Sequence, residues 1–327
     1  MQGAYSLGST IDRLLVTGAS GQIGSELVPY LREIYGKEDV VASDIRKTEL
    51  AETGPFEVLD VTDRPKLENI VKDHKIDAII HLAALLSASG ELRPNVAWNI
   101  NVNGLYNVLE VARELRLARV FHPSSIAVFG PESPRENTPQ ECPLRPRTMY
   151  GITKVTGELL GNYYYNKFGV DVRGARFPGV ISNKTPPTGG TTDYAVEIFY
   201  DAVKYGKYNC FLREDTYLPM MYMPDLLNGT AMFLEADISR LKHHADFNMA
   251  ALSFCPRELS GEIKKHLSDF QITYNPDYRQ AIADSWPKSI DDSAARTEWG
   301  WKHEYGLPAM VKDMLEVLTR RKESGKL

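Results

Sequence analysis

A glycine-rich turn between an apolar run and an amphipathic segment is the feature that most restricts how this chain can fold. The turn is Gly18-Ala19-Ser20-Gly21-Gln22-Ile23-Gly24, and the branched apolar run "RLLVTG" leads into it. Apolar residues then recur at helical spacing from Ile23 to Ile34. Glycines in such a strand-to-helix turn permit close helix packing and close approach of a pyrophosphate to the backbone. The helix N-terminus then offers N–H groups and a positive dipole end to the phosphates.

An acidic residue follows this turn at the distance expected of a dinucleotide-binding unit. Asp44 ends the next apolar run, "DVVASD", about 20 residues beyond Gly24. A carboxylate there accepts a hydrogen bond from an adenosine ribose and repels a 2′-phosphate. We therefore expect dinucleotide binding and favour NAD over NADP. A turn or capping role for Asp44 is the alternative, and Arg46 and Lys47 weaken the case against NADP.

Strands and helices are expected to alternate along the first half of the chain. Expected strands are 13–18, 39–44, 56–61, 77–85, 119–125 and 171–177, and expected helices include 64–74, 96–115 and one that holds Tyr150. Alternation with near-continuously apolar strands predicts an α/β, Rossmann-type, doubly wound parallel sheet. A loop rich in Pro, Gly and Thr follows Phe177. We expect an NAD-binding domain at 11–177 with returning segments near 217–250, and a smaller substrate-binding lobe at 178–216 and 251–327.

Composition and charge exclude several classes of function. The net charge of −5 over 327 residues gives no case for binding nucleic acid or an anionic membrane. No apolar run approaches the roughly 18 residues of a spanning helix. Three scattered cysteines fit a reducing compartment, and neither they nor the histidines have metal-ligand spacing, so we expect no metal. The first ten residues lack the pattern of a signal peptide but fit a transit-peptide stub. We expect a soluble protein, in the mitochondrial matrix if eukaryotic and in the cytoplasm if bacterial.

A tyrosine and a lysine lie one helical turn apart in "RTMYGITK". Tyr150 and Lys154 share a helix face at this spacing, although the same spacing arises by chance in many proteins. Ser124 and Ser125 end an expected strand 25 residues earlier, where ligands bind in parallel sheets. Lys154 would lower the pKa of the Tyr150 hydroxyl, which could then act as a base. A serine hydroxyl would orient the substrate oxygen, and the other serine is expected to cap or turn.

Several motifs resemble one superfamily along nearly the whole chain. "TGASGQIG", "HLAA", "NVNG", "SSIAVFG" and "YGITK" are similar to motifs of the extended short-chain dehydrogenase/reductases. "GGTTDYAVEIFYDAVKYGKY", "LPMMYMPD", "RFPGVIS" and "QITYNPDYRQAIADSWP" resemble the short-chain-type L-threonine 3-dehydrogenases more specifically. The resemblance implies NAD as cofactor, and Ser125, Tyr150 and Lys154 as catalytic residues.

The same resemblance assigns roles to further positions. Asn101 would support the lysine and a water near the nicotinamide. Ser87, Thr191, Thr192 and Asp193 would contact substrate together with Ser125 and Tyr150, although a capping role for the Thr191–Asp193 run competes. The cofactor-binding positions would be Gly18, Gly21, Gln22, Ile23, Gly24, Asp44, Asp60, Val61, Leu82, Ala83, Ala84, Asn101, Tyr150, Lys154 and Pro178.

The implied reaction is oxidation of the L-threonine hydroxyl to 2-amino-3-oxobutyrate. That product gives aminoacetone or passes to a partner, 2-amino-3-oxobutyrate CoA ligase, for glycine and acetyl-CoA. The alternative is a nucleotide-sugar 4-epimerase; a 4,6-dehydratase is disfavoured because Ile126 and Ala127 replace its acid pair, and a non-enzymatic NAD sensor ranks last. Surplus apolar residues on the 96–115 and 147–168 helices, including Tyr163–Tyr165, predict a homodimer. Met220, Met221 and Met223 are expected to pack in the core or line the cleft.

Overall fold

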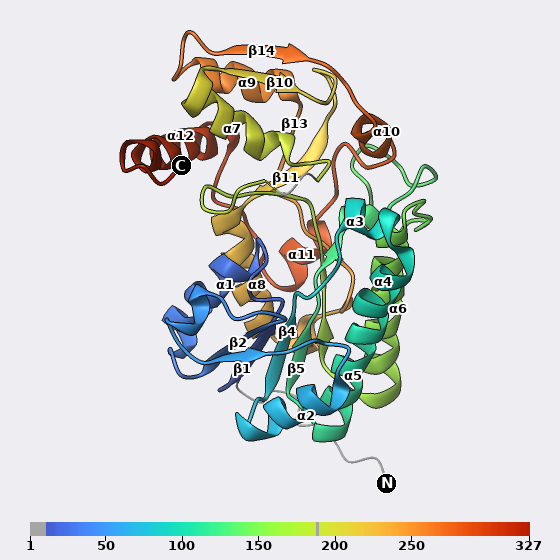
Figure 1. Cartoon of the computed structure of the whole chain (residues 1–327). Helices are drawn as coiled ribbons and strands as arrows, with labels where there is room; N and C mark the ends of the chain where they lie inside the picture. Colours follow the sequence, from blue (N-terminus) through green and yellow to red (C-terminus); the bar gives the residue numbers. More distant parts are fainter. Residues whose placement is uncertain (1–10, 188–189) are drawn as a thin grey trace.

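A six-stranded parallel sheet in the order β3-β2-β1-β4-β5-β7 forms the centre of the first half of the chain in this computed structural model (Figure 1). The structure describes residues 11–187 and 190–327. The strands are β1 Leu14–Thr17, β2 Val40–Asp44, β3 Phe56–Val58, β4 Ala78–His81, β5 Arg119–Phe121 and β7 Val172–Arg173. Each pairing in this sheet is parallel. The predicted Rossmann-type α/β class is therefore confirmed.

Both faces of the sheet are covered by helices, which explains why apolar residues point to both sides of its strands. Leu14 and Val16 of β1 pack in one cluster with side chains from α1 (Gly24–Tyr35) and α8 (Met223–Glu235). Leu15 points the other way and packs in a second cluster. That cluster includes side chains from α2 (Arg64–Asp73), α5 (Gly104–Leu115) and α6 (Met149–Phe168). The alternation along β1 thus divides the core into two layers.

Two expected strands are each broken into a pair. The run 119–125 gives β5 and β6 (Ser124–Ser125), and the run 171–177 gives β7 and β8 (Ala175–Phe177). The second members pair with one another, and β8 also pairs with β12 (Phe247–Asn248), in a separate three-stranded sheet. Gly174 lies at one break, where an added Cβ would lie 2.4 Å from the carbonyl oxygen of Ala245. Prediction of single strands was wrong here because this backbone crowding, which only glycine permits, is not visible in an apolar pattern.

The expected helix at 96–115 is also more complex than predicted. It begins as α4 (Pro94–Trp98), passes through a π-helical turn at Asn99–Asn103 and continues as α5. An additional short helix, α3 (Ser87–Leu92), precedes it where the sequence indicated a loop. Strands β3 and β4 are shorter than the expected 56–61 and 77–85. The glycine and serine content of "SASGEL" hid α3, and a π-helical turn frequently marks a functional position.

The second half of the chain builds a lobe above the carboxyl edge of the main sheet (Figure 1). Its strands are β9 Gly179–Ile181, β10 Lys207–Cys210, β11 Leu218–Tyr222, β13 Leu252–Phe254 and β14 Gln271–Tyr274. Its helices are α7 Tyr194–Tyr205, α9 Pro256–Lys264, α10 Arg279–Asp284 and α12 Leu307–Glu323, while α11 Ser293–Glu298 packs towards α8 and the main sheet. The domain boundary near Pro178 stays a prediction.

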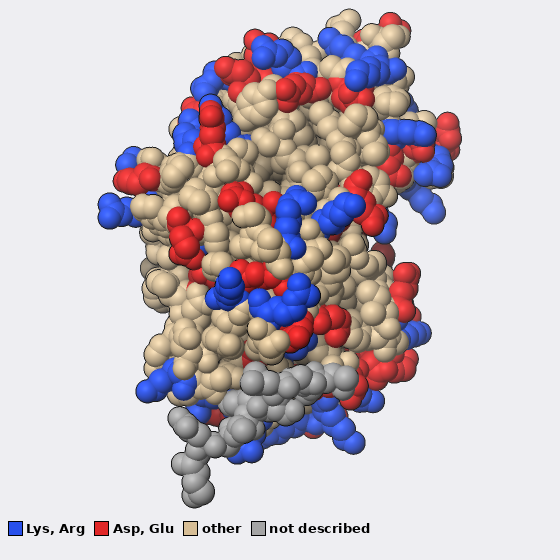
Figure 2. Space-filling model, turned by 180° about the vertical axis from the view of Figure 1, so that it is seen from behind, with Lys and Arg blue, Asp and Glu red and all other residues tan. Residues whose placement is uncertain are grey.

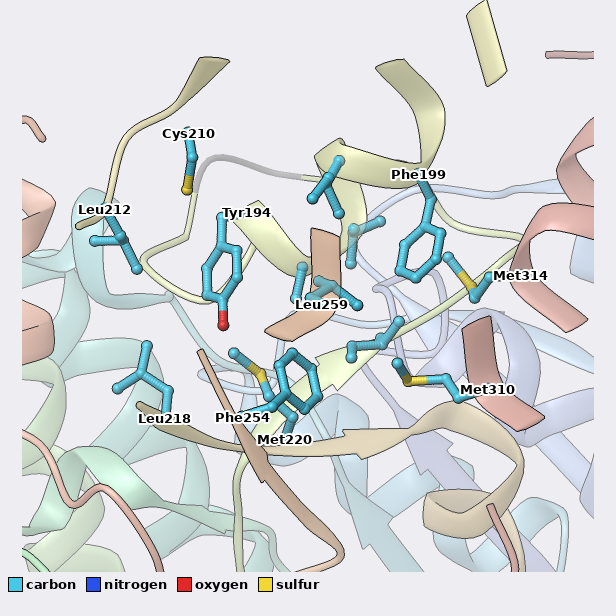
Figure 3. Packing of buried hydrophobic residues seen from close by; sticks show 14 of the residues in the cluster. Tyr194, Phe199, Cys210, Leu212, Leu218, Met220, Phe254, Leu259, Met310 and Met314 are labelled. Carbon is cyan, nitrogen blue, oxygen red and sulfur yellow. The ribbon is translucent and has the colours of Figure 1, made fainter. Parts of the chain in front are cut away.

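An apolar cluster holds this lobe together (Figure 3). Tyr194 and Phe199 of α7 pack with Met220 of β11, Phe254 of β13 and Met310 of α12. Met221 and Met223 are equally buried but belong to the cluster under α1 and α8. The methionines are core residues, as predicted.

On the face shown in Figure 2, positive and negative side chains are interspersed over the molecule. Within the described residues, no helix is both long and apolar enough to cross a membrane. Residues 1–10, which carry the expected transit-peptide stub, lie outside the described residues, as do Thr188 and Gly189 of the loop before α7.

Candidate active site

A cleft of about 410 Å³ opens between the carboxyl edge of the main sheet and the lobe. It collects residues that are far apart in the sequence, from the glycine turn to the segment after α10. Of the predicted site residues, its lining includes Gly18, Gly21, Gln22, Ile23, Gly24, Leu82, Ala84, Ser87, Ser125, Tyr150, Lys154, Pro178, Thr191, Thr192 and Asp193. Asp44, Asp60, Val61, Ala83 and Asn101 are not part of this lining.

The glycine turn has the shape that a bound pyrophosphate requires. Gly18 has a φ of 68°, and a Cβ there would lie 2.5 Å from the backbone nitrogen of Ala83. A Cβ at Gly24 would lie 2.6 Å from the carbonyl oxygen of Ala19, whereas one at Gly21 would meet only the oxygen of Gly18, at 3.4 Å. The turn is thus tight on its inner side and open above Gly21. Helix α1 starts after Ile23, which supplies no side-chain cap, so no capping side chain occupies the N-terminal N–H groups that would face the phosphates.

Asp44 is fixed beside this turn. Its carboxylate accepts from the backbone N–H of Ser20 at 2.9 Å and of Ile45 at 2.7 Å. The first bond attaches the end of β2 to the middle of the glycine turn. Asp44 therefore has the turn-stabilising role considered from the sequence, and its position at the carboxyl end of β2 also suits contact with a ribose.

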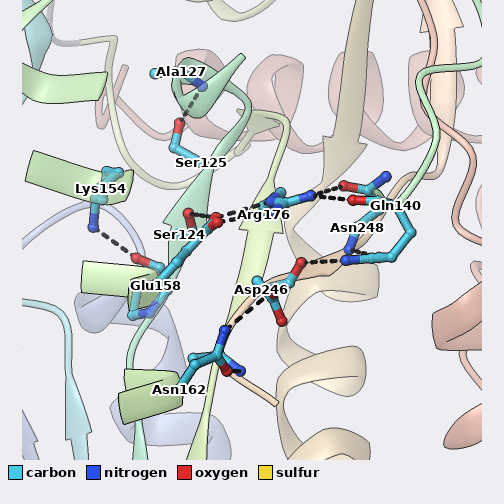
Figure 4. A network of polar contacts seen from close by, with 12 residues as sticks. Ser124, Ser125, Ala127, Gln140, Lys154, Glu158, Asn162, Arg176, Asp246 and Asn248 are labelled. Carbon is cyan, nitrogen blue, oxygen red and sulfur yellow. Dashed lines mark hydrogen bonds and ion pairs between the residues drawn. The ribbon is translucent and has the colours of Figure 1, made fainter. Parts of the chain in front are cut away.

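The two serines have different partners because adjacent residues of a strand point to opposite faces. Ser124 is buried, and its hydroxyl donates to the Glu158 carboxylate at 2.5 Å. The Ser125 hydroxyl accepts from the backbone N–H of Ala127 at 3.2 Å, and Figure 4 shows Ser125 with Ala127 and Ser124 with Glu158. A side-chain hydrogen bond between Ser125 and Tyr150 lowers the pKa of Tyr150. Ser125 is therefore the serine that meets the tyrosine.

Tyr150 and Lys154 lie together at the base of the cleft. The Lys154 Nζ is 5.6 Å from the centre of the Tyr150 ring and donates to the carbonyl oxygen of Pro123 at 2.7 Å. Burial raises the pKa of Tyr150 to about 12, opposed by the hydrogen bond from Ser125. Burial lowers the pKa of Lys154 to about 8, opposed by the charge of Glu158. Burial thus opposes ionisation of Tyr150, and the predicted effect of the Lys154 charge on the Tyr150 pKa stays a prediction.

Asn101 lies in the π-helical turn, and its side chain leaves the helix to bind a neighbouring loop. Its amide oxygen accepts from the N–H of Leu85 at 2.7 Å, and its amide nitrogen donates to the Leu85 carbonyl and to the Thr153 hydroxyl, both at 3.0 Å. Asn101 thus fixes the loop after β4 against α6, one residue before Lys154, and its predicted water-binding role stays a prediction.

The remaining cofactor positions surround the cleft at different depths. Asp60 is exposed and accepts from the N–H and hydroxyl of Thr62 at 2.9 and 2.7 Å, which forms a turn after β3. Val61 is buried in the core, where an added Cβ at Gly104 would lie 2.8 Å from it. Ala83 supports Gly18 from below. Roles for these residues in adenine binding stay predictions.

The expected substrate positions line the same cleft, from the start of α3 and from the residues before α7. Ser87 is the first residue of α3, not a loop residue as expected. A Cβ added at Gly179 would lie 2.7 Å from the Cβ of Thr192, so Thr192 packs closely on β9. Asp193 is buried and accepts from the N–H of Gly190 at 2.9 Å, while its side chain makes no cap bond to α7.

Sequence reasoning missed several residues of the cleft. Trp286, in the segment after α10, is buried and closes the cleft from the lobe side, and Ser89 joins Ser87 on α3. The residues around Trp286 and Ser89 form no motif that would predict a site. The fold, and not their spacing in the sequence, brings these two residues to the cleft. Histidines supply no metal site: among the described residues, no group of three or more His, Cys, Asp or Glu side chains could hold a metal ion.

Comparison with known proteins decides the family. The NAD dependent epimerase/dehydratase family matches residues 14–250. A Staphylococcus haemolyticus protein described as an uncharacterized epimerase/dehydratase is 48% identical over 96% of this chain and 100% of its own length. The chain belongs to the NAD dependent epimerase/dehydratase family. NAD is therefore its cofactor, and the open glycine turn, uncapped α1 and fixed Asp44 fit that dinucleotide.

Solved structures within this family are also similar along almost the whole chain. The L-threonine dehydrogenase of Clostridium difficile is 52% identical, with a TM-score of 0.94, over 96% of this chain and 99% of that one. The GalE-like L-threonine dehydrogenase of Cupriavidus necator in its holo form is 51% identical, with a TM-score of 0.92, over 94% and 99%. This family member is thus similar, in sequence and fold, to NAD-dependent oxidoreductases.

Proposed function

We propose that this protein oxidises the hydroxyl group of L-threonine to give 2-amino-3-oxobutyrate, with NAD+ as the oxidant. The observation that carries the proposal is its similarity to L-threonine dehydrogenases, at 52% identity over 96% of the chain. The meeting of Ser125, Tyr150 and Lys154 in one cleft adds chemical support.

The cleft residues divide the reaction between them. Tyr150, once ionised, would take the proton of the threonine hydroxyl, while the Ser125 hydroxyl would donate to the same oxygen as it becomes a carbonyl. Bound NAD+ supplies an acceptor for the hydride that leaves the β-carbon of threonine. The Lys154 cation would stabilise the Tyr150 phenolate, since opposite charges a few ångströms apart favour ionisation. One proton and one hydride leave the substrate, which accounts for the two-electron oxidation.

The other polar residues of the cleft suit a small zwitterion. The Asp193 carboxylate would pair with the threonine ammonium, and the hydroxyls of Ser87, Thr191 and Thr192 would donate to its carboxylate. Trp286 would close the cleft against longer side chains. Unpaired polar groups in such a site penalise a wrong substrate more than shape alone does. The product could then decarboxylate to aminoacetone or pass to 2-amino-3-oxobutyrate CoA ligase.

The alternative of a nucleotide-sugar 4-epimerase has less support. The stretch "LPMMYMPD" holds no arginine for a nucleotide diphosphate, and Met220 and Met221 within it are fully buried in the two cores. Ile126 and Ala127, in the place of a dehydratase acid pair, are buried as well.

One assay tests the proposal. Purified protein is mixed with NAD+ and, separately, with L-threonine, L-serine, 3-hydroxybutyrate and UDP-sugars, and NADH absorbance is followed. We expect NADH formation with L-threonine at a rate well above that with any other compound. Absence of NADH with L-threonine, together with interconversion of a UDP-sugar, would replace the proposal with the epimerase.

A further inference from the structure

Three successive turns of α6 contact three successive residues of the segment that carries the catalytic serine. Tyr150 forms a hydrogen bond with Ser125, Lys154 donates to the carbonyl of Pro123 at 2.7 Å, and Glu158 accepts from the Ser124 hydroxyl at 2.5 Å. Residues four apart share one helix face, so this contact line is continuous. The catalytic mechanism uses two of these contacts and leaves the third, Glu158 with Ser124, without a role.

Glu158 is itself held by a buried cation. Arg176 of β8 donates from Nε and one terminal nitrogen to the two carboxylate oxygens, each at 2.9 Å (Figure 4). The side chains of Glu158 and Arg176 are each only 3% exposed. In the parallel pairing of β6 with β8, Ser124 is opposite Arg176 and Ser125 is opposite Phe177. Ser124 and Arg176 therefore reach Glu158 from adjacent strands, and the bidentate geometry fixes both of them.

The other end of Arg176 connects this contact line to the lobe. Its remaining nitrogen donates to the Gln140 carbonyl at 2.9 Å and to the Asn248 side chain at 3.0 Å. Asn248 in turn donates to the carbonyl oxygens of Thr138 and Asp291, at 3.2 and 3.0 Å. Asp291 belongs to the segment that follows Trp286, the wall of the cleft. Glu158 thus lies at the centre of a buried network that reaches both sides of the cleft.

We propose that Glu158, held by Arg176, is a positioning residue that fixes β6 against α6 so that Ser125 meets Tyr150. Glu158 touches neither substrate nor cofactor and acts through Ser124 and Lys154. The inference rests on the proposed dehydrogenase function for its kinetic consequences. A misplacement of about 1 Å at a reacting group lowers a rate by about 100-fold, so a register fixed by buried bonds has a large effect on turnover.

The charge of Glu158 gives the proposal a second readout. On its own helix, Lys154 faces Tyr150 and Glu158. His81 and His122 face Lys154 from the carboxyl edge of the main sheet. Burial holds the pKa of both histidines below its usual range, so they are neutral. Burial raises the pKa of Glu158, and Asp246 from the turn before β12 adds to this rise. The charge and hydrogen bonds of Arg176 from β8 oppose it and hold Glu158 in an ion pair. Glu158 is therefore the anion facing Lys154, and its removal should make the ammonium easier to deprotonate.

The test compares Glu158→Gln, Ser124→Ala and a control. Glu158→Gln keeps the shape and removes the charge, and Ser124→Ala removes only the hydroxyl at the contact. The control is Asp171→Asn, which weakens another buried ion pair, between Asp171 and Arg119 at 2.8 Å. This pair lies at the amino ends of β5 and β7, away from the cleft. Measurements are melting temperature, NAD+ affinity by fluorescence, kcat and KM for threonine, and the titration of Lys154 by 13C NMR of lysine Cε in the cofactor-free protein.

We expect Glu158→Gln and Ser124→Ala to lower kcat by about tenfold or more, with NAD+ affinity and KM within about twofold. Glu158→Gln should also move the Lys154 titration to lower pH by about one pH unit. Asp171→Asn should lower the melting temperature and leave kcat within about twofold. If Glu158→Gln does not fold, the kcat of Ser124→Ala decides whether the contact between Glu158 and Ser124 positions the catalytic groups.

Three results would overturn the proposal: an unchanged kcat in Ser124→Ala and Glu158→Gln, an equal loss of kcat in Asp171→Asn, or an unmoved Lys154 titration in folded Glu158→Gln. The NMR titration needs no turnover. A wild-type protein that does not oxidise threonine would therefore refute the proposed function while the titration still decides the role of Glu158.

Discussion

The ammonium of Lys154 donates to the carbonyl oxygen of Pro123 at 2.7 Å, although the two residues lie on different elements and 31 positions apart. Pro123 lies between β5 and β6, where the chain leaves the six-stranded sheet for the smaller one. The bond therefore holds the catalytic cation at the point where the sheet changes partners. It also shows how burial of Lys154 is made tolerable, since a buried ammonium needs an acceptor.

The pH dependence of threonine oxidation follows from opposed shifts in two neighbouring groups. Burial gives Lys154 a pKa of about 8 and Tyr150 a pKa of about 12. The form active in oxidation has lost one proton from this pair, leaving the phenolate beside the ammonium, and interacting groups titrate together. We expect kcat/KM to rise as the pH increases through about 8. In Lys154→Met, kcat/KM should still be rising at pH 10, because only the Tyr150 hydroxyl, with a pKa of about 12, is left to lose a proton. A profile that falls between about pH 6 and 8 would contradict this account.

Removal of the base should abolish most of the turnover. Tyr150→Phe keeps the ring and loses the hydroxyl, so kcat/KM should fall by about 100-fold or more. NAD+ affinity should stay within about twofold, as measured by fluorescence titration. Ser125→Ala should be less damaging, because it removes one hydrogen bond and not the base. Tyr163→Phe, at an exposed tyrosine on the same helix, is the matched control. Wild-type turnover in Tyr150→Phe would refute the mechanism.

Asp44 should set the choice between the two dinucleotides. The wild-type protein should use NAD+ far better than NADP+, because the carboxylate repels a 2′-phosphate. Asp44→Ala should narrow the ratio of the two kcat/KM values by about tenfold or more. Glu49→Ala, at an exposed acid on the following 3-10 helix, should leave the ratio unchanged. Equal use of both cofactors by the wild type would show the assignment to be wrong.

Substrate selection should depend on the polar residues that line the cleft beside the catalytic groups. Ser87→Ala and Thr192→Ala should each raise KM for threonine by about fivefold, the effect of one lost hydrogen bond, and spare NAD+ affinity. Thr273→Ala, at an exposed strand position of the lobe, serves as control. 3-Hydroxybutyrate has the alcohol and carboxylate but no ammonium for Asp193, so it should be a very poor substrate. Its oxidation at the rate of threonine would refute the proposed clamp.

A homodimer is expected from the outer face of three helices. Trp98 on α4, Tyr106 on α5, and Leu159 and Tyr163 on α6 are exposed, with Leu159 at 65% and Tyr163 at 52%. Pairing of two copies would cover these side chains. Light scattering at micromolar concentration should give twice the mass of the chain. Leu159→Glu should give a monomer, whereas Tyr205→Glu, an exposed tyrosine on α7, should not. A monodisperse wild-type monomer would refute the expectation.

The sequence predicted the parts of the fold that periodicity controls. The glycine turn, strands 13–18 and 39–44 and the helix holding Tyr150 were all found where expected. What it could not predict depends on contacts between distant segments. The break at Gly174 goes with backbone crowding against Ala245, and Ser124 and Ser125 could be told apart only by the contact of Ser124 with Glu158. Nothing in the sequence indicated that burial raises the pKa of Tyr150, because the depth of burial is a property of the whole cleft.

Helix α6 has a proposed role on each of its two faces. Its inner face carries Tyr150, Lys154 and Glu158, and its outer face presents Leu159 and Tyr163 to a second copy. If the dimer forms as expected, mass action links assembly to catalysis. Dilution below the dimer dissociation constant would then expose the outer face of α6 to solvent. The inner face of the same helix aligns the reacting groups. Activity per molecule would depend on how many molecules are present, and an assay at nanomolar enzyme would understate the capacity of the concentrated protein.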